Sequence, residues 1–199
     1  AVDSPAFRNS FHSLTRFRNL SKDPLGQLAL LEPPGGLPRE LLEKVRGGVA
    51  GLWNSHFFPA LQSASIVLRE QPFSLRLDGA VLTGVVDLLV RTHDGQWWVV
   101  DYKTDRIDGT MVQERAENYR RQVEAYAYAC GRIIGAQVSR VLIFFAQPQV
   151  WWEGEVTAAT TQTVESSLQG LVRSVQGWRF PSLRGQRCQR CGYGGLHCP

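Results

Sequence analysis

Two acidic residues and a lysine interrupt apolar segments on either side of a short polar turn. The segment 84–89 reads GVVDLL and carries Asp87, and the segment 99–104 reads VVDYKT and carries Asp101 and Lys103. Charged groups in apolar strands are costly unless a bound metal or a reaction requires them. The chain is therefore expected to fold so that neighbouring strands bring these side chains to one metal-dependent site.

The turn between the two segments decides whether the two carboxylates meet. Side chains alternate between the faces of a strand, so Asp101 and Lys103 share a face. A three-residue turn at 93–95 sets Asp87 opposite Asp101, whereas a two-residue turn sets Asp87 opposite Tyr102 and requires a bulge. Facing carboxylates repel each other and favour a hard divalent cation bound through oxygen, with Mg²⁺ as the first choice.

This combination of groups is suited to phosphodiester hydrolysis. A metal ion held by two carboxylates can polarise a phosphodiester and lower the pKa of a bound water. Lys103 beside it can orient that water or stabilise the charge of the transition state. The ordinary alternative is that Asp87 and Asp101 form ion pairs with Lys103 and Arg91, as charged residues on sheets often do.

The hydrophobic pattern predicts a single domain, which is an ordinary size for 199 residues with 43% hydrophobic content. We expect an irregular segment at 1–37, a core at 38–180 and a cysteine-bearing tail at 181–199. Three consecutive strands should form an antiparallel meander. The predicted elements are a helix at 38–53, strands at 65–77, 80–92 and 96–104, a helix at 112–130, strands at 138–146 and 149–156, and a helix at 160–177.

Several motifs occur in the order known from one nuclease family. They are GVVDLL at 84–89, DYKTDR at 101–106, the Gln-x-x-x-Tyr pair Gln122 and Tyr126, and REQPF at 69–73. Through them, residues 65–147 resemble the RecB-type nuclease domains of the PD-(D/E)xK superfamily, which lie at the C-terminal end of helicase–nuclease subunits such as AddA and RecB. The resemblance implies an α/β, restriction-endonuclease-like core of order α-β-β-β-α-β, with a mixed central sheet flanked by helices.

The same resemblance implies a role for each residue of the acidic motifs. Asp87 and Asp101 would ligate Mg²⁺ or Mn²⁺, and the main-chain carbonyl of Tyr102 would complete the ligand set. Lys103 would be a catalytic residue.

Residues outside the acidic motifs also receive roles from the resemblance. Gln122 and Tyr126, one helical turn apart, would face the active site and the DNA. Family members carry a further metal-ligating histidine, usually within Gly-Thr-x-x-His. The corresponding residue here is His12, although Arg8 takes the place of the motif's glycine. The alternative is that this segment matches a serine-rich strand found earlier in RecB-type chains, in which case the histidine motif is absent.

The C-terminal cysteines resemble the segment that binds a 4Fe–4S cluster in iron–sulfur members of the superfamily. These cysteines are Cys188, Cys191 and Cys198. The fourth, upstream cysteine of those members has no counterpart in residues 1–37. The alternatives are a ligand that precedes Ala1, a Zn²⁺ site completed by His197 or Cys130, and a vestigial group that binds nothing.

The charge of the chain permits DNA as a partner. A formal net charge of +4 is compatible with a polyanionic partner without requiring one. Four arginines could contact phosphates without reading sequence, with a solvated helix face as the alternative: Arg106, Arg115, Arg120 and Arg121. No stretch of about 18 apolar residues and no secretory signal is found, so we expect no membrane partner and a cytoplasmic location.

Together these patterns predict a Mg²⁺-dependent deoxyribonuclease, acting as an exonuclease or an endonuclease. The resemblance implies single-stranded DNA as substrate, a helicase motor in cis or in trans, and a role in double-strand-break repair and recombination. Because the chain begins at Ala1 and its one methionine is Met111, we expect it to be part of a longer helicase–nuclease polypeptide. The alternative function is a catalytically inactive nuclease-fold module that binds DNA or serves as a scaffold.

Overall fold

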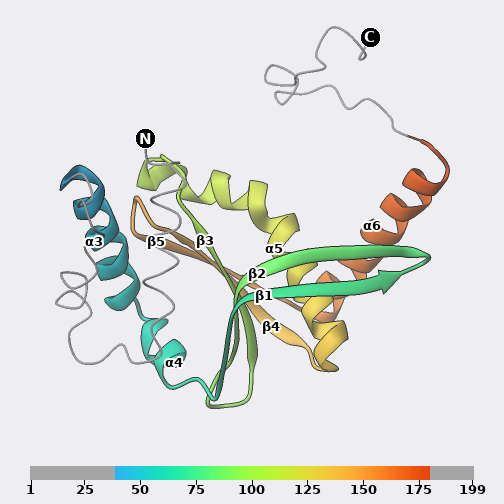
Figure 1. The fold of residues 1–199 in the computed structure, drawn as a ribbon, viewed down its shortest axis with the longest axis horizontal. Helices are drawn as coiled ribbons and strands as arrows, with labels where there is room; N and C mark the ends of the chain where they lie inside the picture. The colour runs from blue at the N-terminus through green and yellow to red at the C-terminus, as the bar shows by residue number, and fades with distance from the viewer. Residues whose placement is uncertain (1–38, 180–199) are drawn as a thin grey trace, which may run out of the picture.

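A mixed sheet of five strands forms the centre of the computed structural model, which describes residues 39–179 (Figure 1). The first three strands form the predicted antiparallel meander. The fourth strand runs parallel to the third, and the fifth runs antiparallel to the fourth. In spatial order the strands are β1 (Ile66–Leu77), β2 (Ala80–Arg91), β3 (Trp97–Lys103), β4 (Val138–Phe145) and β5 (Val150–Glu155).

Helices cover both faces of this sheet, as expected for the α-β-β-β-α-β core. Two short elements were not predicted, because a helix of three to five residues shows no hydrophobic periodicity. They are α4 (Phe58–Gln62) and the 3₁₀ turn η1 (Gly109–Met111). Helix α5 runs one turn further than predicted and ends at Gly135, whose φ of 67° is left-handed. The helical elements are α3 (Arg39–Trp53), α4 (Phe58–Gln62), η1 (Gly109–Met111), α5 (Val112–Ile134) and α6 (Ala158–Gln176).

The alternation of side chains along β3 divides the core into two parts. Val100 and Tyr102 pack on the side covered by α3 and α4, whereas Val99 packs on the side covered by α5. Asp101 and Lys103 are two and four residues beyond Val99, so they lie on the α5 side. Helix α5 therefore covers the face of the sheet that carries the charged residues.

The β1–β2 hairpin extends beyond the rest of the sheet toward α6 (Figure 1). Its turn is Asp78-Gly79, as predicted, and both residues have positive φ, at 48° and 81°. The side chain of Gln176 at the end of α6 donates a hydrogen bond of 2.9 Å to the carbonyl of Asp78. The tip of the hairpin is thereby joined to the last helix.

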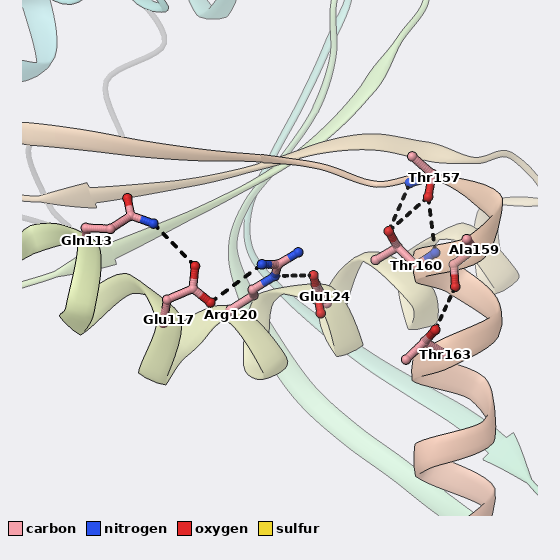
Figure 2. A network of polar contacts seen from close by, with 8 residues as sticks. All are labelled: Gln113, Glu117, Arg120, Glu124, Thr157, Ala159, Thr160 and Thr163. Carbon is pink, nitrogen blue, oxygen red and sulfur yellow. Dashed lines mark hydrogen bonds and ion pairs between the residues drawn. The ribbon is translucent and has the colours of Figure 1, made fainter.

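Helix α6 begins with a capping box. The Thr157 hydroxyl accepts a bond from the main-chain N–H of Thr160, and the Thr160 hydroxyl accepts one from the N–H of Thr157 (Figure 2). Within residues 39–179, no helix combines the length and the apolar character that crossing a bilayer requires.

Gly84 in β2 lies beneath two aromatic rings. It is paired with Phe73 of β1, and a Cβ at this position would come within 2.6 Å of the Phe73 ring and 3.2 Å of the Tyr126 ring. The glycine of the GVVDLL motif is therefore required by close packing, because its φ is not in the left-handed region.

We expect Gly84→Ala to lower the free energy of unfolding by about 1–3 kcal/mol, because the new methyl group displaces both rings. Urea denaturation measures this change. Gly109→Ala is the matched control, since a Cβ at Gly109 meets nothing within 4 Å. Equal stability of the two variants would contradict the packing described for Gly84.

Candidate active site

Strands β2 and β3 pair in the register that sets Asp87 opposite Asp101. The ladder extends to the pair Leu88–Val100, and one further step along the same register joins the two acidic positions. The turn between the strands has three residues and ends at Gly95, whose φ is 85°. The three-residue alternative is thus correct and the two-residue alternative is wrong, so no bulge is needed to bring the carboxylates to one face.

The Asp87 carboxylate binds the main chain of β3 at the point where the two strands separate. Its Oδ2 accepts a hydrogen bond of 2.7 Å from the N–H of Tyr102. This N–H lies beyond the last β2–β3 pair, so the side chain satisfies a donor that the ladder no longer reaches. The bond places Asp87 beside the peptide unit whose carbonyl was expected to be a metal ligand.

The phenol of Tyr102 lies on the opposite face of the sheet. It is buried against the core on the α3 and α4 side. Burial, followed by the charge of Asp87, raises the pKa of this phenol well above its usual value, so it remains neutral. Tyr102 can therefore contribute to the site only through its main chain.

Lys103 is held beside Asp101 and faces α5. Its Nζ lies 2.7 Å from Asp101 Oδ2, in an ion pair whose side chains are only 15% and 5% exposed, respectively. The same ammonium donates a hydrogen bond of 3.1 Å to Gln122 Oε1. A buried ion pair is stable only when further polar contacts support it, and Gln122 supplies one of them.

The Gln-x-x-x-Tyr pair forms a connected set of contacts that leads to this lysine. Gln122 Nε2 donates to the hydroxyl of Tyr126 at 2.9 Å. The ring of Tyr126 packs edge-on against Phe73, with 5.5 Å between centroids and 72° between planes, and lies above Gly84. The β1–β2 hairpin thus fixes Tyr126, Tyr126 fixes the Gln122 amide, and Gln122 fixes Lys103.

The β1–β2 ladder is interrupted at Glu70, a residue that the sequence motifs indicated only as part of a strand. Glu70 falls opposite Asp87 in the β1–β2 register, but the ladder skips this one pair. The φ of Glu70 is 48°, a strained backbone conformation for this residue type. The break brings the strained position next to the point where β2 leaves β3.

Two further residues near Lys103 were missed by the sequence reasoning. Tyr119 is one turn before Gln122 on α5, and its ring centroid is 4.2 Å from Lys103 Nζ. Asp105 follows β3, and its carboxyl group contributes to the raised pKa of Tyr119. The signal for Tyr119 was its spacing of three residues from Gln122, which indicates a shared helix face.

The four arginines expected near DNA fall into two groups. Arg120 pairs with Glu124 at 2.8 Å and Glu117 at 3.5 Å along α5 (Figure 2). Arg115 pairs with Asp105 at 3.5 Å. These two guanidinium groups are already engaged by carboxylates. The other two, Arg106 and Arg121, are exposed.

The donor set at this site matches a hard divalent cation. Mg²⁺ commonly binds one or two carboxylates and completes its shell with water and substrate phosphates, so Asp87, Asp101 and the Tyr102 carbonyl suit it. Among residues 39–179, no three His, Cys, Asp or Glu side chains gather into a metal-binding group. Two carboxylates and one carbonyl leave much of the coordination shell to water and substrate, as Mg²⁺ prefers.

The remaining predicted ligands lie outside the described residues, namely His12, Cys188, Cys191 and Cys198. Cys130 is described, and it is buried in the core between α5 and the sheet. Burial raises the pKa of its thiol to about 11, which disfavours the thiolate that a metal requires.

Comparison with known proteins identifies the family. Residues 14–196 match the sequence model of the PD-(D/E)XK nuclease superfamily. The chain belongs to this superfamily. Membership agrees with the family indicated by the motifs and with the mixed sheet and flanking helices of its fold. The crystal structure of a candidate exonuclease from Eubacterium rectale has a similar fold, with a TM-score of 0.53 and 14% identity over 97% of this chain and 71% of that one.

Relatives of this superfamily member include several ATP-dependent helicase/nuclease subunits. The protein of this name from Listeria welshimeri is 33% identical over 107 residues, which cover 45% of this chain and 9% of that protein. The protein from Lysinibacillus sphaericus is 29% identical over 129 residues, covering 56% and 10%, respectively. The match to each of these curated relatives thus spans a tenth of its length or less.

The bond between Asp87 and Tyr102 generates a stability prediction. Asp87→Ala leaves the Tyr102 N–H without its acceptor and should lower the free energy of unfolding by about 1–3 kcal/mol relative to Asp87→Asn. Both substitutions remove the charge, and only the asparagine keeps an oxygen at the acceptor position. Hydrogen exchange at the Tyr102 amide should be faster in Asp87→Ala alone. Equal exchange in the two variants would show that the bond is absent.

Proposed function

We propose that this chain is a divalent-metal-dependent deoxyribonuclease domain that hydrolyses phosphodiester bonds. The observation that carries the proposal is the position of Lys103, 2.7 Å from Asp101 on the face where the register sets Asp87 opposite Asp101. Membership of a nuclease superfamily supports the same conclusion.

Asp87, Asp101 and the carbonyl of Tyr102 are the groups that would hold Mg²⁺ or Mn²⁺. When bound there, the ion would polarise the phosphodiester and lower the pKa of a coordinated water. The two carboxylates also keep the site negative, which suits it to a cation and disfavours DNA phosphate until that cation is present.

Lys103 would stabilise the transition state directly. In hydrolysis, a water oxygen bonds to phosphorus while the bond to the departing sugar oxygen breaks, and negative charge builds up on the phosphoryl oxygens. An ammonium has three N–H donors, so Lys103 can bind a phosphoryl oxygen while it remains between Asp101 and Gln122. Its contacts hold that charge in place before the substrate arrives.

The helix α5 would orient this lysine and contribute to DNA binding. Gln122 and Tyr126 connect Lys103 to the β1–β2 hairpin and limit its movement. Arg106 and Arg121 are exposed and can contact phosphates without reading the base sequence. Arg120 would have to exchange its contacts with Glu117 and Glu124 for a phosphate.

The biological setting that we propose rests on the names of the relatives. Because they are named helicase/nuclease subunits, we propose that this domain works with a helicase motor, in cis or in trans, on the single-stranded DNA it releases. Double-strand-break repair and recombination in the cytoplasm is the process proposed for it. The alternative, an inactive scaffold that binds DNA, would keep the Asp101–Lys103 ion pair without using it, so a cleavage assay separates the two functions.

We expect the protein to cleave single-stranded DNA, and Asp101→Ala and Lys103→Ala each to lower kcat by about 10²–10³-fold. A fluorescent oligonucleotide separated on a denaturing gel measures the cleavage. Glu114→Ala, which removes an exposed carboxylate at the start of α5, should retain wild-type activity. Cleavage that survives both site substitutions would exclude the proposed mechanism.

Metal dependence has a separate test. Treatment with EDTA should abolish cleavage, and added Mg²⁺ or Mn²⁺ should restore it, because two facing carboxylates require a cation before a phosphate can approach. Asp87→Asn should raise the Mg²⁺ concentration needed for half-maximal activity. Full activity of the wild-type protein in EDTA would contradict the assigned role of the two carboxylates.

A further inference from the structure

Tyr119 of α5 faces the same ammonium as the two polar partners of Lys103. Its ring centroid lies 4.2 Å from Lys103 Nζ, within the range of a cation–π contact. Asp101 Oδ2 lies 2.7 Å from the same nitrogen, and Gln122 Oε1 lies 3.1 Å from it. The ammonium is thus enclosed by a carboxylate, an amide and an aromatic ring.

The ring of Tyr119 is itself held by packing. Its body packs against the buried core on the α5 side, with its centroid 6.4 Å from that of Phe145. Burial, followed by the neighbouring Asp105 carboxyl group, raises the pKa of Tyr119 to about 12, so the phenol stays protonated. Asp105 is paired in turn with Arg115 at 3.5 Å.

We propose that Tyr119 is a positioning residue that sets the location of the Lys103 ammonium through its aromatic ring. Packing against Phe145 and the core behind it holds the ring against the lysine. Asp101 and Gln122 each contact one side of the ammonium, and a long, flexible side chain with only those contacts could still swing away from the substrate. The Tyr119 ring blocks this movement of the lysine side chain. Because the ring is uncharged, it adds no further negative group that could bind the metal ion.

This inference rests on the proposed function, because a positioned lysine matters only if Lys103 takes part in the reaction. A residue with a purely packing role would tolerate leucine, which keeps an apolar side chain between α5 and the sheet. A cation–π contact requires the ring and not the hydroxyl. Substitution of Tyr119 by phenylalanine, which keeps the ring, and by leucine, which keeps only an apolar side chain, therefore distinguishes a cation–π role from a packing role.

The kinetic experiment compares Tyr119→Phe and Tyr119→Leu on the same oligonucleotide. Tyr119→Leu should lower kcat about 10- to 100-fold, with KM changed by no more than about twofold, because a misplaced lysine weakens only the transition state. Tyr119→Phe should stay within about threefold of wild type. Tyr128→Phe is the matched control, since its hydroxyl bonds Glu165 on α6, away from Lys103.

Three kinetic results would overturn the proposal. They are wild-type kcat in Tyr119→Leu, equal losses in the phenylalanine and leucine variants, and a loss confined to KM. Unfolding curves of each variant show whether the leucine variant is folded at the assay temperature. If it is not, Tyr119→Trp replaces it, because a displaced but present ring should give a partial loss of kcat.

A spectroscopic measurement separates this inference from the proposed function. Protons above an aromatic ring are shifted upfield, so the Lys103 Hε resonances should lie upfield in wild type and Tyr119→Phe and return to ordinary values in Tyr119→Leu. The Lys103 Hε resonances are assigned as those that disappear from the spectrum of Lys103→Arg. An upfield shift in a wild-type protein that cleaves no DNA would overturn the nuclease and leave the contact standing, whereas an unshifted resonance would overturn the contact whatever the activity.

Discussion

The register of β2 against β3 is the constraint on which the rest of the site depends. A slip of one residue would send every side chain of a strand to the opposite face, and Asp87 would then enter the core on the α3 side. The three-residue turn ending at Gly95 sets the register, and the bond from the Tyr102 N–H to Asp87 holds its far end. Between these two points lie the buried apolar pairs that make the strands rigid.

Helix α5 supplies the contacts that stabilise the buried ion pair of Lys103 and Asp101 on this face of the sheet. A charged pair that is almost fully buried needs polar partners, and α5 supplies an amide and an aromatic ring at one-turn spacing. Neither partner carries a charge, so the site remains attractive to a divalent cation. The same helix is tied to β1 through Tyr126 and Phe73, and the glycine at position 84 leaves room for both rings.

The sequence was sufficient for the strands, the long helices and the acidic motif, because each has a strong local pattern. It could not decide the β2–β3 register, since both turn lengths were compatible with the residues. The contact between Tyr119 and Lys103 could not be predicted, because the face that α5 turns toward the sheet is decided by tertiary packing. The pairing of Arg120 with Glu117 and Glu124, by contrast, follows helical spacing and was predictable. Short elements such as α4 and η1 carry too few residues for periodicity.

Diffraction from a crystal soaked with Mn²⁺, recorded at the manganese absorption edge, tests the central claim most directly. The account predicts an anomalous peak beside Asp87, Asp101 and the main chain of Tyr102, and no such peak in Asp101→Ala. The absence of a peak between these residues in the wild-type protein at saturating Mn²⁺, or its persistence in Asp101→Ala, would contradict the assignment of this strand pair as a metal-dependent active site.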